Sequence, residues 1–340
     1  MEHKIIRFEP LKATEEVWEA YHGLQDKLSL ELNPEDPLLP RPTRRAMLES
    51  SEAAPFHNKY HFLMLAPGGE ACGYAFVYAE TPRSPSYHTN KATATMELSV
   101  LPEFRLRGLG TALYRHMSRH VTAREPQVKE FLCAVLTEPG SRFAQRLGGK
   151  MSLEQAENRL WFKELDWTMV ENWAAKGAAA NPATKTLAIT AIPDEDLVPL
   201  AELFSEVLNQ QPMGEIDVTL KIAPEQLRLR EELDRKNGGE TILIYAKEAD
   251  GSISGLTDMG YHPDRPYRAT QMFTGVRASC RGRGLGKLLK ALMLLHLRAS
   301  HPEIKYITTA NAPSNGPMMA INNALGFRKH RGILLYKLPA

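Results

Sequence analysis

The sequence predicts two tandem α+β domains, and three observations carry that prediction. The length of 340 residues suits two domains of roughly 150 residues each. The stretch VLPEFRLRGLGTALYRHM from Val100 returns 176 residues later as VRASCRGRGLGKLLKALM from Val276. The order of strand-like and helix-like segments around these two stretches also repeats. We therefore expect domains over residues 1–170 and 187–340, joined by a linker over 171–186.

Composition and charge describe an ordinary globular protein. Hydrophobic residues make up 43% and charged residues 24%, which excludes a disordered or collagen-like chain. The formal net charge is only +2, whereas a dedicated nucleic-acid-binding protein usually carries a larger basic excess. We therefore expect no nucleic-acid partner.

The chain also carries no sign of a membrane, a secretory route or a metal. No run approaches the roughly 18 apolar residues of a membrane span, and residues 1–10 lack the apolar centre of a signal peptide. Cys72, Cys133 and Cys280 form neither a disulfide framework nor a zinc-binding spacing. We expect a soluble, cytoplasmic protein with no membrane partner and no metal site.

Each half is expected to contain the same series of elements. Hydrophobic patterning and turn residues place the strands of the first half at 5–8, 62–66, 72–78, 95–100, 130–136 and 159–165. The corresponding strands of the second half fall at 187–192, 241–246, 253–261, 272–276, 306–309 and 333–338. Helices are expected at 194–209 and 224–236 and directly after each repeated stretch. The small, Gly- and Pro-containing segment 173–185 indicates a linker, although its alanines could equally extend a preceding helix.

The repeated stretch contains a glycine-rich loop between a strand and a helix. Such a loop directs backbone N–H groups and the positive end of the helix dipole at one spot, where glycine lets a phosphate approach closely. Arginine side chains suit a diphosphate. Both loops therefore predict binding of a pyrophosphate-bearing cofactor. Their residues are Arg105, Leu106, Arg107, Gly108, Leu109 and Gly110 in the first half and Arg281, Gly282, Arg283, Gly284, Leu285 and Gly286 in the second.

Spacing separates this motif from other phosphate-binding loops. A Walker A loop needs GxxxxGK[ST], and the second loop is one residue short, with Leu288 where Ser or Thr is required. A dinucleotide-binding fingerprint needs GxGxxG, which neither loop has. Both loops match [QR]xxGx[GA] in full. A purely structural turn and an RNA-binding RGRG patch remain alternatives for a single loop, but two loops in equivalent positions favour a shared function.

With these motifs the sequence resembles, twice over, the GNAT superfamily of N-acetyltransferases. Residues 308–327, TTANAPSNGPMMAINNALGF, are similar to the fifth strand of that family and the helix after it. The layout is similar to that of mycothiol synthase-like two-domain GNAT proteins. The resemblance implies, in each domain, a mixed and mostly antiparallel central sheet flanked by helices.

The resemblance also implies acetyl-CoA as the acetyl donor. In the family, strands 4 and 5 splay apart, often at a bulge, and the pantetheine arm pairs with strand 4 in the gap. The two glycine loops would then hold the pyrophosphate. The residues expected beside the pantetheine arm are Leu98, Ser99, Val100, Thr274, Gly275 and Val276 through their backbone, and Asn311 and Asn315 through their side chains.

Glu97 is the candidate catalytic base. It lies three residues before Val100 on strand 4, where many GNAT enzymes place a carboxylate that takes the proton of the amine. An outward-facing strand glutamate is the alternative interpretation. The second domain has Phe273 at the equivalent position, so Asp258, Tyr261 or His262 on the adjoining hairpin, or Glu240, would have to replace the base.

The tyrosine that usually serves as the acid of the family is missing from both halves. Counting seven residues from Asn315 reaches Asn322, and the first half has Ala144 at that place and Thr137 in place of the asparagine. A thiol with a pKa of about 8.5 can leave near neutral pH without strong assistance.

The resemblance thus implies an N-acetyltransferase that moves acetyl to a primary amine by direct attack in a ternary complex. The acceptor would be a small amine, an aminoglycoside-like compound or a peptide N-terminus. A non-catalytic acyl-CoA-binding scaffold and a transferase with a different acyl donor remain alternatives. Oligomeric state is left open by the sequence.

Overall fold

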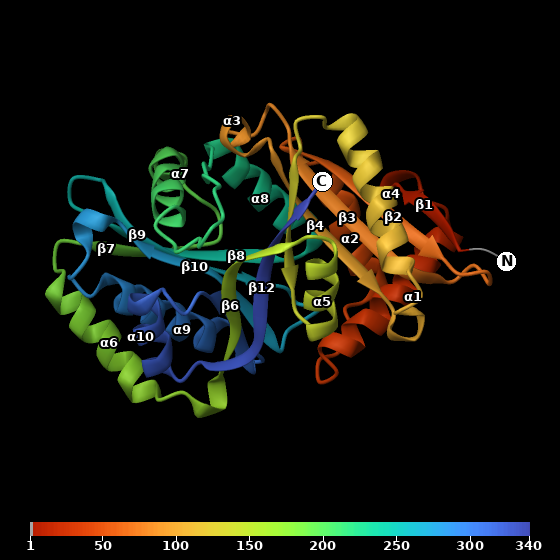
Figure 1. Cartoon of the computed structure of the whole chain (residues 1–340). Helices are drawn as coiled ribbons and strands as arrows, with labels where there is room; N and C mark the ends of the chain where they lie inside the picture. The colour runs from red at the N-terminus through yellow and green to blue at the C-terminus, as the bar shows by residue number, and fades with distance from the viewer. Residues whose placement is uncertain (1–2) are drawn as a thin grey trace. The chain divides into compact units, whose positions relative to one another are not determined.

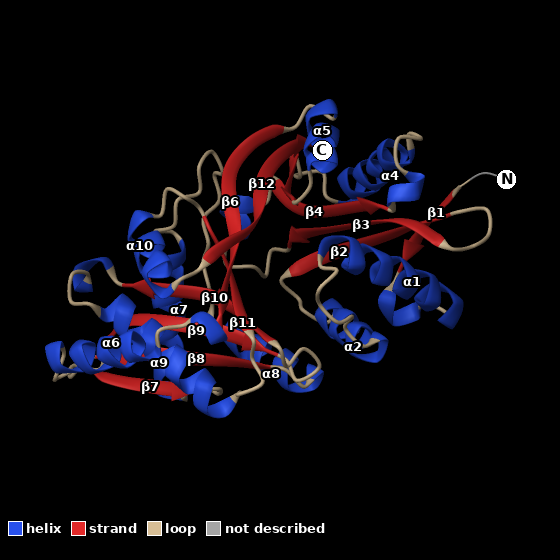
Figure 2. Cartoon of the chain, turned by 90° about the horizontal axis from the view of Figure 1, so that it is seen from below, coloured by secondary structure: helices blue, strands red, loops and turns tan. Residues whose placement is uncertain are grey.

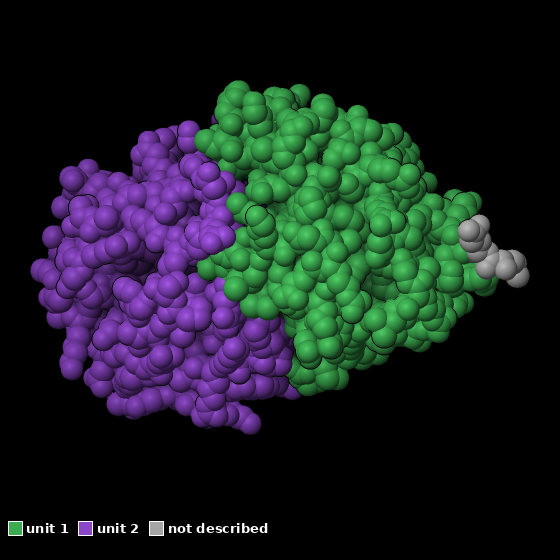
Figure 3. Space-filling model, in the orientation of Figure 1, with its two compact units in different colours: residues 1–153, 334–340 green, residues 154–333 purple. Residues whose placement is uncertain are grey.

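The computed structural model describes residues 3–340 (Figure 1). They divide into two compact units, coloured in Figure 3: unit 1 runs to Leu153 and includes Leu334–Ala340, and unit 2 is Glu154–Ile333. Each unit is a mixed, mostly antiparallel sheet with helices on both faces. The predicted fold class is therefore confirmed.

Unit 1 contains the first ten helices and strands. They are β1 (Lys4–Phe8), α1 (Glu15–Leu32), α2 (Arg41–Glu52), β2 (His57–Leu65), β3 (Ala71–Glu80), α3 (Tyr87–Asn90), β4 (Thr93–Val100), α4 (Leu109–Arg124), β5 (Glu130–Val135) and α5 (Glu138–Arg146). The last strand of the chain, β12 (Arg328–Pro339), completes the sheet, whose order is β1-β2-β3-β4-β5-β12. Only β4 and β5 are parallel neighbours in this set.

Unit 2 has the same arrangement. Its elements are β6 (Lys150–Trp161), α6 (Trp167–Ala180), β7 (Lys185–Ile189), α7 (Asp194–Leu208), α8 (Pro224–Asn237), β8 (Glu240–Lys247), β9 (Ile253–Tyr261), β10 (Arg268–Val276), α9 (Leu285–Ser300), β11 (Tyr306–Asn311) and α10 (Gly316–Leu325). Its strand order is β6-β11-β10-β9-β8-β7, with β10 and β11 parallel and the other neighbours antiparallel.

Apolar side chains on both faces of each sheet account for the helix layers. In unit 1, α4 packs on one face through Leu113 and Met117, and α1 packs on the other through Trp18 and Leu24. Figure 2 shows α1 and α2 on the opposite side of this sheet from α4. In unit 2, α9 and α6 cover one face while α7 and α8 cover the other. The leucine spacing expected in α9 produces its buried face.

The closing strands differ from the prediction, because the two halves exchange them. We expected each half to end its own sheet at 159–165 and 333–338. Instead, β6 pairs with β11 of unit 2 over 156–161, and β12 pairs with β5 of unit 1 over 334–339. Burial explains the choice: Tyr336 and Leu338 enter the core of unit 1, and Leu160 enters the core of unit 2. The unit boundaries therefore lie near 153 and 333 rather than at 170 and 187.

The segment expected as the linker 171–186 is mostly the helix α6. Asp166 caps its N-terminus by accepting a hydrogen bond of 3.0 Å from the backbone N–H of Met169. Gly177 lets α6 approach α9, since a Cβ there would lie 2.7 Å from Cβ of Leu288. The segment 167–180 is therefore a helix that packs closely on α9 at Gly177, which corrects the linker interpretation.

Candidate functional site

Two parallel strands splay apart in each unit, at the place expected for the pantetheine arm. In unit 1 the β4–β5 pairing ends at Thr95 and Leu132, so β5 leaves one edge of β4 unpaired over 96–100. In unit 2 the β10–β11 pairing ends at Thr270 and Thr308, and the free edge of β10 runs over 271–276. The backbone of Leu98, Ser99, Val100, Thr274, Gly275 and Val276 lies on these edges. An unpaired strand edge can accept an extended amide-bearing chain by adding a strand.

Only unit 2 has the bulge that the resemblance led us to expect. The register of β10 against β9 shifts between Gln271 and Phe273, which leaves Met272 unpaired and 60% exposed. The side-chain amide of Gln271 donates hydrogen bonds of 2.8 Å to the carbonyl oxygens of Asp258 and Phe273. It thereby satisfies the backbone groups that the bulge displaces. The β3–β4 ladder of unit 1 runs without a shift over its whole length.

The two glycine loops have matching conformations. Gly108 and Gly284 each precede the helix at a φ of 79°. Two residues earlier, Leu106 and Gly282 occupy equivalent positions with φ of 60° and 82°. Leu106 is the only residue other than glycine with positive φ among the described residues, and its side chain is 94% exposed. The first loop therefore keeps the shape of the second although a leucine replaces the glycine.

Each loop presents a row of unused backbone donors. Among residues 3–340, no hydrogen bond involves the N–H groups of 106–111 or 282–287; the first bonded amides are those of Ala112 and Leu288. Neither helix has a side-chain cap. Free N–H groups together with a helix dipole favour a bound anion, and anion binding by these two loops stays a prediction.

The arginines of the loops are largely committed to their own chain. Arg105 donates hydrogen bonds of 2.7 and 2.6 Å to the carboxylate of Glu31 on α1. Arg283 makes a 2.9 Å ion pair with Glu248. Arg281 bonds to Gln210, whereas Arg107 lies over the ring of Phe104. Backbone N–H groups, more than arginine side chains, are thus the groups of these loops that remain free for a ligand.

The region first expected to be a linker anchors the second loop. Asn181, which follows α6, accepts a hydrogen bond of 2.9 Å from Nε of Arg283 and donates one of 3.1 Å to its carbonyl oxygen. Thr184 accepts another of 2.8 Å from the same guanidinium. Sequence reasoning missed these contacts, because no local pattern connects residues about a hundred positions apart.

Glu97 lies on β4 just beyond the point where the strands separate. It is exposed to solvent and stands opposite Phe76 in the β3–β4 ladder. Partial desolvation by the surrounding protein raises the pKa of the Glu97 carboxyl above its usual value. Burial, with a smaller contribution from the charge of Glu97, raises the pKa of Tyr21 on α1 to about 12. Glu97 therefore faces the side of the sheet that α1 covers, beside a phenol that sequence reasoning did not find.

In unit 2 the corresponding carboxylate lies on the neighbouring strand, β9. Phe273 occupies the position equivalent to Glu97, and Asp258 lies opposite it on β9. Oδ2 of Asp258 accepts a 3.0 Å hydrogen bond from Arg230 of α8, while its buried Oδ1 has no partner among the described residues. Burial raises the pKa of Asp258 to about 6 in spite of the arginine.

The other replacements considered for the base have roles in the fold. The hydroxyl of Tyr261 donates to Glu303, and the ring of His262 bonds to the carbonyl oxygen of Asn237 at 2.8 Å. Glu240 lies 3.1 Å from the ring of His301. Asp258 is thus the one of the four with an unpaired buried oxygen beside the bulge.

The asparagines of unit 2 differ in their surroundings. Asn315 precedes α10 and makes no side-chain cap. Asn311 ends β11 and accepts a 2.7 Å hydrogen bond from the amide of Asn322, which is 1% exposed. Asn322 is therefore buried at the place where the family usually has its tyrosine. In unit 1, Thr137 caps α5 through Gly140 and plays a structural part.

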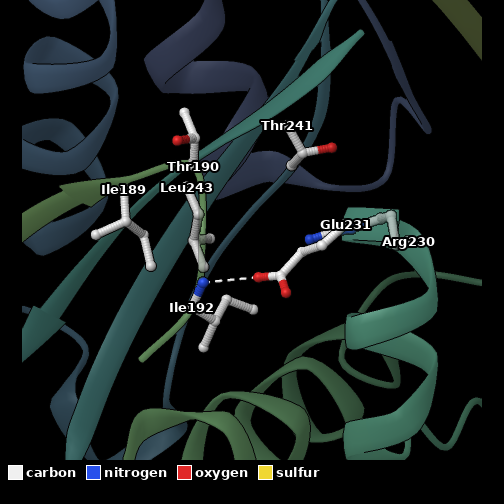
Figure 4. A pocket seen from close by; sticks show the side chains of 7 residues that line it. All are labelled: Ile189, Thr190, Ile192, Arg230, Glu231, Thr241 and Leu243. Carbon is white, nitrogen blue, oxygen red and sulfur yellow. Dashed lines mark hydrogen bonds between the residues drawn. The ribbon is translucent and has the colours of Figure 1, made fainter. Parts of the chain in front are cut away.

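A small hollow lies near the Arg230–Asp258 pair (Figure 4). Two of its lining residues are joined there, since Glu231 accepts a 2.6 Å hydrogen bond from the backbone N–H of Ile192. Arg230 lines the hollow and reaches from it to Asp258. The lining residues are Ile189, Thr190, Ile192, Arg230, Glu231, Thr241 and Leu243, none of which we predicted as site residues.

Over residues 3–340, no helix is long and apolar enough to cross a membrane. No group of three or more His, Cys, Asp or Glu side chains in this part of the chain is arranged to hold a metal. The three cysteines are free, two of them buried.

Comparison with known proteins gives a family match for part of the chain and a fold for the whole of it. Residues 24–148 match the family model described as the acetyltransferase (GNAT) family. None of the curated protein sequences compared with the chain matches it.

Solved structures match over almost the whole chain. A tandem GNAT protein from the clavulanic acid biosynthesis pathway is 22% identical with a TM-score of 0.75, covering 99% of this chain and 98% of that one. A GCN5-related N-acetyltransferase from Sphaerobacter thermophilus is 17% identical with a TM-score of 0.64, over 99% and 95%. N-myristoyltransferase of Saccharomyces cerevisiae with bound myristoyl-CoA is 11% identical with a TM-score of 0.58, over 99% and 82%. The chain therefore has the tandem GNAT fold, and its residues 24–148 match the acetyltransferase family model.

Proposed function

We propose that the chain is an N-acetyltransferase that moves the acetyl group of acetyl-CoA to a primary amine by direct attack in a ternary complex. The observation that best supports this is the grouping in unit 1. There, the free edge of β4, the uncapped glycine loop and Glu97 lie at one end of the splayed strands. The strand edge would pair with an extended chain, the loop would bind an anion, and Glu97 would serve as the base.

The residues present fit acetyl-CoA, which supplies an activated acetyl thioester when bound. The N–H groups of 106–111 and 282–287 would hold the pyrophosphate. The free edges of β4 and β10 would pair with the amides of the pantetheine arm. Both units therefore have the parts of a binding site, and we propose that both bind acetyl-CoA.

In unit 1, Glu97 would take the proton of the acceptor ammonium onto its carboxylate. A protonated amine has no lone pair with which to attack, so removing this proton is required. The raised pKa of Glu97 brings the carboxyl closer to the pH at which an efficient general base works. Free N–H groups on the edge of β4 would polarise the reacting carbonyl, and the binding surfaces would orient the two reactants.

The acceptor class follows from the surroundings of Glu97. A carboxylate beside the rings of Phe76 and Tyr21 favours a positively charged amine. A small amine, an aminoglycoside-like compound and a peptide N-terminus all carry such a group. The free cysteines are compatible with the cytoplasm, which we propose as the compartment.

Calorimetric titration with acetyl-CoA tests the binding part of the proposal. The proteins are the wild type and the single variants Gly108→Glu and Gly284→Glu. A Cβ at either glycine meets nothing within 4 Å, so the carboxylate repels phosphate without displacing neighbours. Gly108→Ala and Gly284→Ala are matched controls that carry the same backbone strain without the charge. We expect two sites in the wild type, one lost in each Glu variant and both retained in the Ala controls.

Turnover with a panel of amines then separates the alternatives. Acetylation that needs an intact first loop and Glu97 supports the proposal. Binding of acetyl-CoA without turnover of any amine would favour a non-catalytic scaffold. One of the similar structures holds myristoyl-CoA, so preferential binding of a longer acyl-CoA would indicate a different donor. No binding of any acyl-CoA would refute the proposed function.

A further inference from the structure

Unit 2 buries a lysine without a carboxylate partner. Lys290 lies on α9 and is 2% exposed. Its ammonium lies 5.2 Å from the centre of the Phe327 ring and donates a 2.8 Å hydrogen bond to Oδ1 of Asn322. None of the ion pairs among residues 3–340 includes it. Burying a cation without an anionic partner costs free energy, because the charge loses its hydration. A methionine would fill the same space without that cost. Packing alone therefore does not explain a lysine at this position.

The hydrogen bonds of Lys290 have a fixed direction. An ammonium group can only donate, so Asn322 must turn its amide oxygen toward Lys290. The amide nitrogen of Asn322 then points away and donates a 2.7 Å hydrogen bond to Oδ1 of Asn311. Because Asn311 accepts through its oxygen, its own NH2 group is the part left to donate elsewhere. No other hydrogen bond of the Asn311 side chain occurs among residues 3–340.

Asn311 stands at the separated end of the two parallel strands. Pairing between β10 and β11 stops at Thr308, three residues earlier. The Asn311 side chain is only partly buried, in contrast to Asn322 and Lys290. The three residues therefore form a polar chain from the core on α9, through α10, to the gap between the strands.

We propose that Lys290 is a positioning residue that acts through Asn322 to hold the NH2 group of Asn311 ready to donate to a carbonyl oxygen of the pantetheine arm. This inference rests on the proposed binding of acyl-CoA by unit 2. It adds the orientation of the Asn311 side-chain amide and names Lys290 and Asn322 as the residues that impose it. Burial lowers the pKa of Lys290 to about 7, so the cationic, donor-only form of the lysine predominates below neutral pH.

Titration with two probes tests the inference. All variants are made in the full chain carrying Gly108→Glu, so that the remaining site is the one in unit 2. Acetyl-CoA is compared with 3′-phosphoadenosine 5′-diphosphate, the fragment of coenzyme A that lacks the pantetheine arm. The variants are Lys290→Met, Asn311→Ala and the double variant, with Met293→Leu as a control for a core change on the same helix.

We expect Lys290→Met and Asn311→Ala each to weaken acetyl-CoA binding by about five-fold, the size of one hydrogen bond. The double variant should lose little more, because both changes remove the same bond. Binding of the pantetheine-free fragment should stay unchanged in all of them, as should both affinities in Met293→Leu.

The opposite results would overturn the inference in distinguishable ways. If Lys290→Met weakened the binding of both probes equally, the lysine would support the folding of the loop in general and would not position Asn311. Additive losses in the double variant would separate Lys290 from Asn311. If the parent protein binds the fragment but not acetyl-CoA, the positioning role fails alone; if it binds neither probe, the proposed function of unit 2 fails with it.

Discussion

Asp258 lies directly opposite Phe273 in the ladder between β9 and β10, in the register in which Phe76 lies opposite Glu97 in unit 1. The two units thus hold the same pair of residue types, a phenylalanine and a carboxylic acid, with the strands exchanged. The carboxylate of unit 1 is open to solvent, whereas that of unit 2 is 1% exposed and covered by Arg230. This difference favours unit 1 for proton transfer.

Replacing Glu97 by glutamine should slow acetyl transfer by roughly 100-fold, because the amine loses its base. The wild-type rate should fall as the pH drops through the raised pKa of Glu97, since only the ionised carboxylate accepts a proton. Measurement of kcat/KM against pH checks both statements. Glu97→Asp keeps the charge and should retain part of the rate. An unchanged profile in Glu97→Gln would move the chemistry to another group.

Asp258 should make stability depend on pH between about 4 and 6. Its pKa of about 6 in the folded chain exceeds the usual 3.8, so the contribution of this group is fully present below pH 4 and lost as the pH rises through 6. The loss amounts to roughly 3 kcal/mol. We therefore expect the free energy of unfolding of Asp258→Asn, measured with denaturant, to exceed that of the wild type by an amount that increases from pH 4 to pH 7. A constant difference would contradict the raised pKa.

Lys290 should affect stability over a higher pH range and in the opposite direction. Its pKa falls from 10.5 to about 7 on folding, so the contribution is fully present above pH 10.5 and lost as the pH falls through 7. The shift corresponds to about 5 kcal/mol. Urea unfolding should show that Lys290→Met raises the free energy of unfolding above that of the wild type most at pH 6 to 7 and least near pH 10. A gain independent of pH would show that the lysine is charged in both states.

Leu106 and Gly282 allow a matched test of backbone strain. Both have positive φ, which costs a residue other than glycine about 1 kcal/mol. Leu106→Gly should therefore leave stability unchanged or raise it slightly, while Gly282→Leu should lower it by about 1 kcal/mol. Thermal unfolding of the two variants gives the comparison. Equal effects of both substitutions would mean that the loops differ in shape.

The repeat made much of this site predictable. Residues 176 positions apart share a conformation, and the strand positions of Glu97 and Phe273 follow from counting back from each loop. The splaying of the parallel strands came from the resemblance. Local patterns express backbone geometry well, because glycine placement and hydrophobic period act within a few residues.

Contacts between side chains that are distant in the chain could not be predicted from the sequence. The commitment of Arg283 to Glu248, the cover of Asp258 by Arg230 and the burial of Lys290 depend on how helices pack on the sheets. Lys290 is one charge within a largely apolar helix segment, and we predicted no role for it from the sequence. The exchange of closing strands was equally hidden, since an alternating strand does not specify which open edge it will join.

That exchange ties completion of the first sheet to residues made long after the rest of it. The edge of β5 is filled by residues 334–339, which leave the ribosome only after the whole of unit 2. Until they are made, the nascent first unit exposes an open edge and the part of its core that Tyr336 and Leu338 will cover. A chain stopped just before residue 334 would therefore leave the earliest-made unit incomplete, although residues 1–153 had long been translated.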